Sequence, residues 1–261
     1  MGPYLFVSSG APQATVRLWH GLGAHAKSSR PSLSAARLAD DDPRALTGIM
    51  RITKHEHACL RLESEGRTLL IDPGSWTLPL AELDHVVGVV LTHEHPDHWT
   101  PEHLRRIRRQ FPEVPIYGPA GVVVAAAEFD VTEVSPGDTL ELEPFTLRFF
   151  GGKHNVIHET IPVVDNVGVL VDGEFYYPGD SYAVPKGVEV GVLAAPIGAP
   201  WLKIGEAIDF VLAVAPRRAF GTHDMTLSQL GLASHAARLT WATEQGGGEY
   251  VPLAPGEAID L

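Results

Sequence analysis

The sequence contains a single cysteine, Cys59, among its 261 residues. One cysteine cannot form a disulfide within the chain, and it excludes the cysteine-rich sites that hold structural zinc. This scarcity fits a reducing compartment. Long hydrophobic runs are also missing, because no apolar stretch approaches the roughly 18–20 residues that a membrane-spanning helix needs. Together these absences predict a cytoplasmic protein without a membrane segment.

Basic residues are outnumbered by acidic ones, with 20 Lys and Arg against 32 Asp and Glu and a formal net charge of -12. An acidic surface repels phosphate backbones, so this balance disfavours nucleic acid as a partner. The length and the 44% hydrophobic content are sufficient for one large domain or two small ones.

Acidic residues are absent from the start of the chain, where none precedes Asp40. Residues 1–48 are rich in Ser, Ala, Gly and Arg, which predicts a weakly ordered N-terminal extension. An organelle transit peptide, or sequence upstream of a start at Met50, is an alternative interpretation of the same composition. We expect the folded domain to comprise residues 49–261.

From residue 49 onward, strand patterns alternate with helical patterns. Strands are predicted at residues 51–62, 68–71, 86–91, 116–117, 131–134, 139–142, 146–150, 166–171, 174–177, 188–194 and 250–253. Helices are predicted at residues 101–109, 120–129, 205–215 and 228–240. Each half of the domain thus provides a strand-rich layer with helices outside it. The pattern predicts an α/β fold with four layers, an αββα sandwich.

Four metal-capable side chains lie close together after the predicted strand at 86–91: His93, His95, Asp97 and His98. Pro96 prevents a helix through this segment, so the four side chains must converge through a tight turn. Imidazoles and a carboxylate packed in this way are typical of a divalent-metal site. A set of solvated loop histidines is the alternative.

The segment from Thr92 to His98 matches a His-x-His-x-Asp-His motif and resembles the metallo-β-lactamase-fold hydrolases. The resemblance extends over roughly residues 49–261. It is strongest to the single-domain subgroup that includes ascorbate-6-phosphate lactonase-like proteins. Further landmarks follow in the family's order, namely Ile71-Asp72-Pro73-Gly74, His154 after a strand, Gly179-Asp180-Ser181 and Gly221-Thr222-His223.

The resemblance implies a site for two divalent metal ions, Zn²⁺ in the first instance, with Mn²⁺ or Fe²⁺ as alternatives. The implied ligands are His93, His95 and His154 for one ion, Asp97, His98 and His223 for the other, and Asp180 as a bridge between them. Asp97 and Asp180 are the expected catalytic residues, and Asp97 would also orient the attacking hydroxide. Shared in this way, the ligands leave each ion an open position for water.

Five more residues are candidates for supporting roles. His57 and Asp72 would orient metal ligands. His158, Trp201 and Lys203 would contact substrate, with Lys203 binding an anionic group and Trp201 forming an apolar wall. Each has a purely structural alternative, such as a surface histidine, a packing tryptophan or a solvated lysine.

The resulting hypothesis is a metal-dependent hydrolase that uses a hydroxide held by two metals on a small ester, lactone or phosphoester, which can be anionic. A nuclease of the tRNA-processing type is an alternative on the same fold, but it needs a basic arm that we do not find. Reduction of oxygen or nitric oxide at a di-iron site would need a carboxylate in place of an early histidine, and a flavin domain. A non-catalytic metal-binding module would be expected to have lost ligands. Many members of the family self-associate, so a homo-oligomer is compatible with the resemblance.

Overall fold

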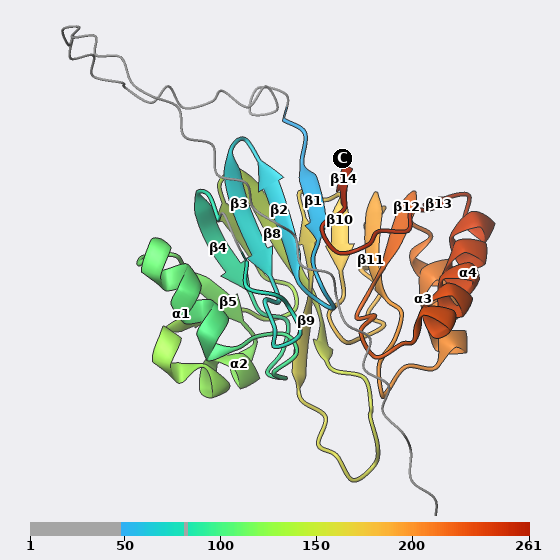
Figure 1. Cartoon of the computed structure of the whole chain (residues 1–261), viewed down its shortest axis with the longest axis horizontal. Helices are drawn as coiled ribbons and strands as arrows, with labels where there is room; N and C mark the ends of the chain where they lie inside the picture. Colours follow the sequence, from blue (N-terminus) through green and yellow to red (C-terminus); the bar gives the residue numbers. More distant parts are fainter. Residues whose placement is uncertain (1–47, 81–82) are drawn as a thin grey trace, which may run out of the picture. The chain divides into compact units, whose positions relative to one another are not determined.

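The computed structural model describes residues 48–80 and 83–261. In this part of the chain, two seven-stranded sheets lie between layers of helices (Figure 1). The arrangement confirms the predicted αββα sandwich. Except for residue 48, the expected N-terminal extension lies outside the described residues. No helix within the described ranges is both long and apolar enough to cross a membrane.

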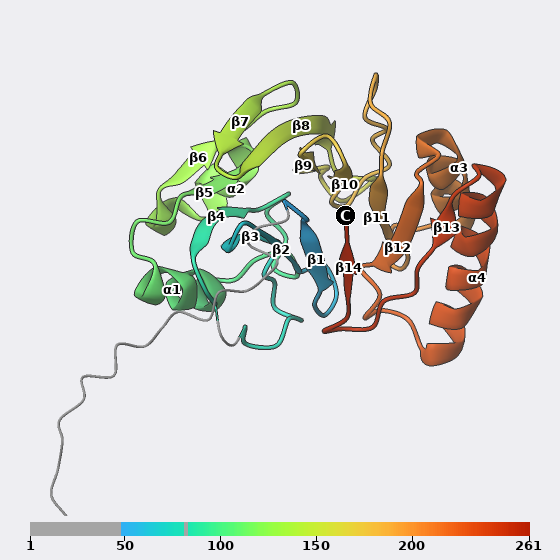
Figure 2. The ribbon, with the colours of Figure 1, turned by 90° about the horizontal axis from the view of Figure 1, so that it is seen from above.

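The first sheet has the strand order β14-β1-β2-β3-β4-β5-β6. Its strands are β1 (Arg51–Lys54), β2 (Leu60–Ser64), β3 (Arg67–Ile71), β4 (Val86–Val90), β5 (Ile116–Gly118), β6 (Val131–Glu133) and β14 (Ala258–Asp260). The pairs from β14 to β3 are antiparallel and those from β3 to β6 are parallel. Helices α1 (Pro101–Gln110) and α2 (Ala120–Ala125), with the 3-10 turn Ala127–Phe129, cover its outer face (Figure 2).

The second sheet has the strand order β13-β12-β11-β10-β9-β8-β7. Its strands are β7 (Thr139–Leu142), β8 (Phe145–Lys153), β9 (Asp165–Val171), β10 (Phe175–Tyr177), β11 (Val192–Pro196), β12 (Arg218–Thr222) and β13 (Glu249–Tyr250). The pairs from β7 to β10 are antiparallel and those from β10 to β13 are parallel. Helices α3 (Ile204–Val214) and α4 (Gln229–Gln245) cover its outer face.

The main core lies between the two sheets, because alternate residues of each strand point inward. In the first sheet Leu60 and Leu62 alternate with half-exposed neighbours, and in the second Leu147 and Phe149 do the same. A helix-side core flanks each sheet on its outer face. Parallel strands that are covered on both faces explain the continuous burial of Val192–Pro196 in β11.

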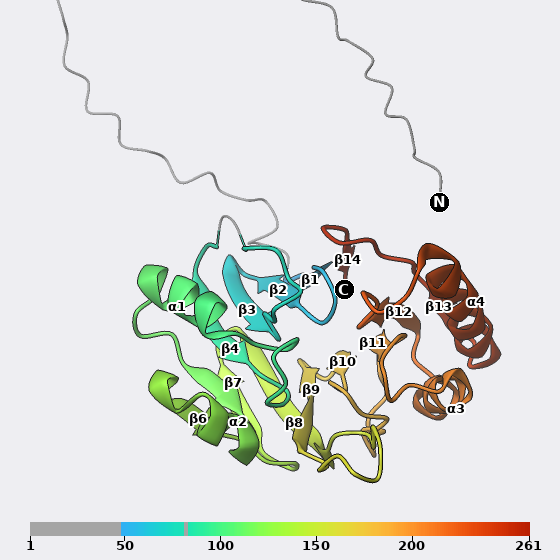
Figure 3. The same ribbon diagram turned by 60° about the horizontal axis from the view of Figure 1, so that its bottom comes forward.

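Strand direction brings the candidate residues to one edge of each sheet. β3 and β4 are parallel, and so are β10, β11 and β12, while β8 shares their direction because it is antiparallel to β9. The carboxyl ends of these strands therefore meet. At this end the sheets are joined by a bridge between His93 and Asn166 and a 2.9 Å hydrogen bond from Val167 N to Thr92 O. Figure 3 turns this end of the sandwich toward the reader.

Several element boundaries differ from the predictions. The strand predicted over residues 51–62 is broken into β1 and β2 by a turn, in which His57 has a φ of 58°. The helix predicted over residues 120–129 ends at Ala125, and the strand predicted over 188–194 lies later, as β11. β14, which pairs with β1, was not predicted. Its three residues follow no long periodic pattern, so only the tertiary pairing defines it as a strand.

Candidate metal centre

The loop from His93 to His98 is held by a close approach of the loop that follows β3. A Cβ atom on Gly74 would lie 1.7 Å from the carbonyl oxygen of Asp97, so only glycine fits at this position. Ser75 N then donates to Pro96 O at 2.8 Å, and His98 N to His95 O at 3.0 Å. The predicted turn is thus fixed by its neighbour as well as by Pro96.

Asp72 supports the same loop from beneath. Its buried carboxylate accepts hydrogen bonds from Thr92 N (2.8 Å), Thr92 Oγ1 (2.6 Å) and His98 Nδ1 (2.7 Å). These bonds fix the ring of His98, as expected for a residue that orients a metal ligand.

Asp180 is positioned by the start of β9. Asn166 accepts from Asp180 N at 3.0 Å and donates to Pro178 O at 2.9 Å. Gly179 has a φ of 62°, and a Cβ there would lie 2.5 Å from the Asn166 side chain. A glycine before Asp180 is therefore a steric requirement of this turn.

Three histidine rings are oriented by hydrogen bonds from their Nδ1 atoms. His98 donates to Asp72, His154 to Asn155 O and His223 to Gly198 O. Their Nε2 atoms are consequently free of protons in the neutral ring. These Nε2 atoms are buried and point toward carboxylate oxygens of Asp180, which cannot donate a hydrogen bond to them. Buried lone pairs without a donor are costly unless a cation binds them.

The spacing of the donor atoms fits metal coordination. His93 Nε2 lies 3.1 Å from His95 Nδ1. Oxygen atoms of Asp180 lie 3.2 Å from His98 Nε2, 3.3 Å from His154 Nε2 and 3.1 Å from His223 Nε2. Donors that surround one ion tetrahedrally at about 2.0–2.1 Å lie about 3.3 Å apart. The residues present therefore fit divalent cations.

The structure brings all seven expected ligands together. The residues whose donor atoms converge form three groups: His93, His95 and His154; His57, Asp97, His98 and His223; and His93, His98 and Asp180. Asp180 touches histidines of both of the first two groups. Its position suits a carboxylate that serves two cations.

His57 is the member of these groups that the sequence interpretation placed outside the ligand set. Its Nε2 lies 3.2 Å from Asp97 Oδ2, and its Nδ1 faces the backbone N–H of Met225 at 3.4 Å. Because Nδ1 accepts there, the ring proton sits on Nε2 and is donated to Asp97. This tautomer makes His57 a residue that holds Asp97 rather than one that offers a lone pair.

The carboxylates are ionised in this environment. Burial alone would raise the pKa of Asp97, but hydrogen bonds from His223 and His57 outweigh it and hold that pKa well below its usual value. Burial likewise opposes the ionised form of Asp180, whose pKa is lowered by the neighbouring His223 and His98. Both groups are thus acceptors at neutral pH.

The imidazoles separate into two kinds. Burial lowers the pKa of His93, which keeps this ring neutral. Burial would also lower the pKa of His98, but Asp180 and Asp72 raise it above its ordinary value, and Asp180 raises the pKa of His223 to about 9 against the effect of burial. Cations that bind to His98 and His223 must therefore compete with protons.

Trp201 is buried and donates from Nε1 to Asp180 Oδ2 at 2.8 Å. The side chain thus has a polar contact that was not expected, and its role as an apolar wall toward substrate stays a prediction. The sequence gives no sign of this contact, because an indole next to Pro200 and Leu202 has the pattern of a packing residue.

We expect Trp201→Phe to lower metal affinity or turnover by about 10–100-fold, because the ring is retained while the donor that fixes Asp180 is lost. The measurement is a metal-binding isotherm beside kcat. Trp241→Phe, on the exposed face of α4, is the matched control and should change neither. Wild-type metal affinity together with wild-type kcat in Trp201→Phe would contradict the role.

His158 and Lys203 lie apart from the ligand groups. His158 is exposed and its Nδ1 contacts Thr160 Oγ1 at 2.8 Å. Lys203 is exposed and precedes the first residue of α3, and it forms no ion pair with any described residue. Their expected roles toward substrate therefore remain predictions.

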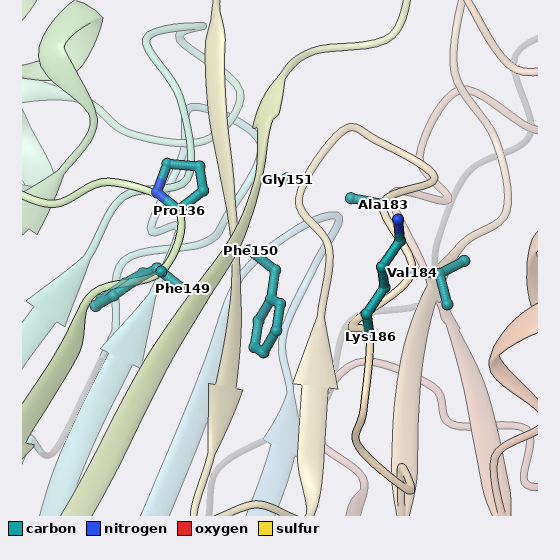
Figure 4. A pocket seen from close by; sticks show the side chains of 8 residues that line it. Pro136, Phe149, Phe150, Gly151, Ala183, Val184 and Lys186 are labelled. Carbon is teal, nitrogen blue, oxygen red and sulfur yellow. The ribbon is translucent and has the colours of Figure 1, made fainter.

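A separate pocket of about 380 Å³ lies over the outer face of β8 (Figure 4). It is lined by Pro136, Gly137, Phe149, Phe150, Gly151, Ala183, Val184 and Lys186. The pocket offers one ammonium group and no metal-ligating side chain. This lining differs from the histidine and aspartate groups, which hold the metal-capable donors.

Comparison with known proteins gives a consistent result. The sequence profile of the family described as "Beta-lactamase superfamily domain" matches residues 51–223. A Mycobacterium tuberculosis protein is 35% identical over 199 residues, which are 74% of this chain and 93% of the relative. A "UPF0173 metal-dependent hydrolase" of Anoxybacillus flavithermus is 40% identical over 53 residues, 19% of this chain and 24% of the relative.

A solved structure has a similar fold. Igni18, described as a novel metallo hydrolase from Ignicoccus hospitalis, superposes with a TM-score of 0.64 at 17% identity. The match covers 82% of this chain and 98% of Igni18.

Proposed function

The chain belongs to the metallo-β-lactamase superfamily of metal-dependent hydrolases, and from this premise we propose that it cleaves a small ester, lactone or phosphoester at a two-metal centre. The observation that carries the proposal is the convergence of the buried Nε2 atoms of His98, His154 and His223 on the Asp180 carboxylate, at 3.1–3.3 Å. Two divalent cations, when bound, supply a water of lowered pKa and polarise the bond that breaks. Zn²⁺ suits the donors best, with Mn²⁺ or Fe²⁺ as alternatives.

Asp97 is the catalytic carboxylate in this proposal. Its side chain is 21% exposed, whereas Asp180 and the histidines around it are buried. A carboxylate that faces both the ligand groups and solvent can accept a hydrogen bond from the attacking water and orient it. His57 and His223, each 3.2 Å from Asp97 Oδ2, hold the carboxylate in place.

The substrate in this proposal is a small molecule of the cytoplasm. The net charge of -12 disfavours nucleic acid. Lys203, with no ionic partner among the described residues, is a candidate for binding an anionic group of the substrate.

Metal analysis combined with a substrate panel tests the proposal. We expect about two divalent ions per chain, and cleavage of at least one class among esters, lactones, thioesters and phosphodiesters. Chelation should abolish the activity and Zn²⁺ or Mn²⁺ should restore it. Less than one ion per chain together with no hydrolysis across the panel would refute the proposal.

His154 and His158 provide a matched pair for the same experiment. His154→Ala should reduce the metal content by about one ion per chain, because it removes one Nε2 donor. His158→Ala should leave the metal content unchanged, since this exposed ring contacts Thr160. A loss of metal in both variants would show that the assignment of donors is wrong.

A further inference from the structure

The carboxyl-end loops that surround the candidate metal centre expose a concentration of large apolar side chains. Twelve large hydrophobic residues are exposed in the part of the chain that the structure describes. Six of them lie on three loops, which follow β3, β8 and β12 and begin at Asp72, His154 and His223. We call these six the apolar rim: Trp76, Leu78, Val156, Ile161, Val163 and Met225, each 42–67% exposed.

Two members of the rim, Trp76 and Met225, contact His57, which in turn contacts the expected ligand Asp97. The Trp76 ring is 4.3 Å from the ring of His57, whose Nε2 is 3.2 Å from Asp97 Oδ2. Met225 N faces the other nitrogen of the same ring at 3.4 Å. His57 itself is fully buried, and the half-exposed Trp76 contacts its ring from the solvent side.

The loop with Trp76 is rigidly placed. Gly74 touches the backbone of Asp97 too closely for any side chain, Ser75 N donates to Pro96 O, and Leu78 N donates to Glu56 Oε2 at 3.1 Å. These contacts anchor the backbone on both sides of Trp76.

The loop after β8 carries the remaining three members of the rim. It leaves the sheet at the His154 N to Val164 O hydrogen bond of 3.1 Å, and Asn155 N donates to Asp180 O at 2.9 Å. Between these anchors Val156, Ile161 and Val163 are exposed, together with His158 and Glu159. The loop projects beyond the strand ends (Figures 1 and 3).

We propose that the apolar rim binds an acyl or aryl group of the substrate, so that the preferred substrates are esters or lactones with a medium-length alkyl chain or an aromatic ring. The proposal rests on the proposed hydrolytic function and names its substrate class. A small ligand is favoured over a protein partner because Trp76 contacts His57, which contacts Asp97. A substrate group bound at Trp76 would therefore lie close to the substrate bond that is cleaved at the metal centre. Exposed apolar surface next to a polar centre is typical of ligand sites.

Binding and turnover along a chain-length series test the proposal on the metal-loaded full chain. The probes are alkyl hydroxamates from two to ten carbons, measured by calorimetry, and p-nitrophenyl esters of the same lengths, measured as kcat/KM. We expect the affinity to rise about two- to fourfold per methylene over the length that the rim can cover. Trp76→Ser and Leu78→Ser should flatten this dependence while the metal content stays unchanged.

Two variants control for exposed apolar residues elsewhere. Leu230→Ser is on α4, and Val184→Ser is in the pocket over β8, and both should keep the wild-type slope. Affinity that does not increase with chain length, or a slope lost in Val184→Ser and kept in Trp76→Ser, overturns the proposal.

The two proposals fail in different ways. Cleavage of short and long esters at equal kcat/KM would leave the hydrolytic function intact and remove the apolar substrate class. Hydroxamate affinity that rises with length, without hydrolysis of any ester, would support the rim and remove the ester reaction. Failure of every hydroxamate to bind would overturn the rim.

Discussion

Asp97→Ala should lower kcat on the order of 10³-fold or more while the protein remains folded. The substitution removes the carboxylate that lies 3.2 Å from both His57 and His223. In the group formed by His57, Asp97, His98 and His223, only Asp97 is partly exposed to solvent. Because the side chain is partly exposed and lies outside the hydrophobic cores, its loss leaves the packing of the two sheets untouched. The measurements are kcat, metal content and the cooperativity of thermal unfolding.

Glu94→Ala is the matched control, since Glu94 is a carboxylate of the same loop. Its side chain approaches Gly121 at the start of α2 and belongs to none of the donor groups. We expect activity close to that of the wild type. If Asp97→Ala retains turnover, or if both variants lose it equally, the orienting role of Asp97 is wrong.

Asp72→Ala should destabilise the protein by about 3–5 kcal/mol, because it leaves three buried donors without an acceptor. Those donors are Thr92 N, Thr92 Oγ1 and His98 Nδ1. For a domain of this size the loss corresponds to a decrease in Tm of roughly 6–20 °C. Metal content should fall as well, since the ring of His98 loses the bond that orients it. Denaturant unfolding and metal analysis measure the two effects.

Asp72→Asn separates the effect of the backbone conformation from the effect of the negative charge. Asp72 has a φ of 49°, a conformation that asparagine tolerates and alanine does not. The asparagine variant should therefore be clearly more stable than the alanine variant, but still weaker in metal binding. Equal stability of wild type and Asp72→Ala would show that the buried network around His98 contributes nothing.

The cluster from His93 to His98 could be predicted from the residues themselves, whereas the later candidate ligands were implied by the family resemblance, which places each of them at the end of a strand. His93, His154, Asp180 and His223 all follow strands in the structure, and the parallel direction of their strands makes the ends meet. The sandwich was predictable from the residues as well, since strands and helices alternate in each half. Local periodicity was sufficient for the sandwich and for the first cluster, and the resemblance supplied His154, Asp180 and His223.

Other features depend on contacts between distant parts of the chain. The alternating residues 58, 60 and 62 suggested a strand that included His57, yet His223 N donates to His57 O at 2.8 Å and the chain turns there. Trp201 finds its acceptor on Asp180 only after the second sheet has formed. No local sequence pattern predicts either contact.

The hydrogen bond from Val167 to Thr92 and the bridge from Asn166 to His93 also have a consequence for synthesis and folding. They join segments that belong to different sheets, and pairings between residues so distant in sequence form slowly. His223 is added only after both sheets have been largely translated. An unfinished chain thus holds its first histidines but cannot surround a cation with the full set. We therefore expect the complete ligand set to form only in a chain whose two sheets have already been joined.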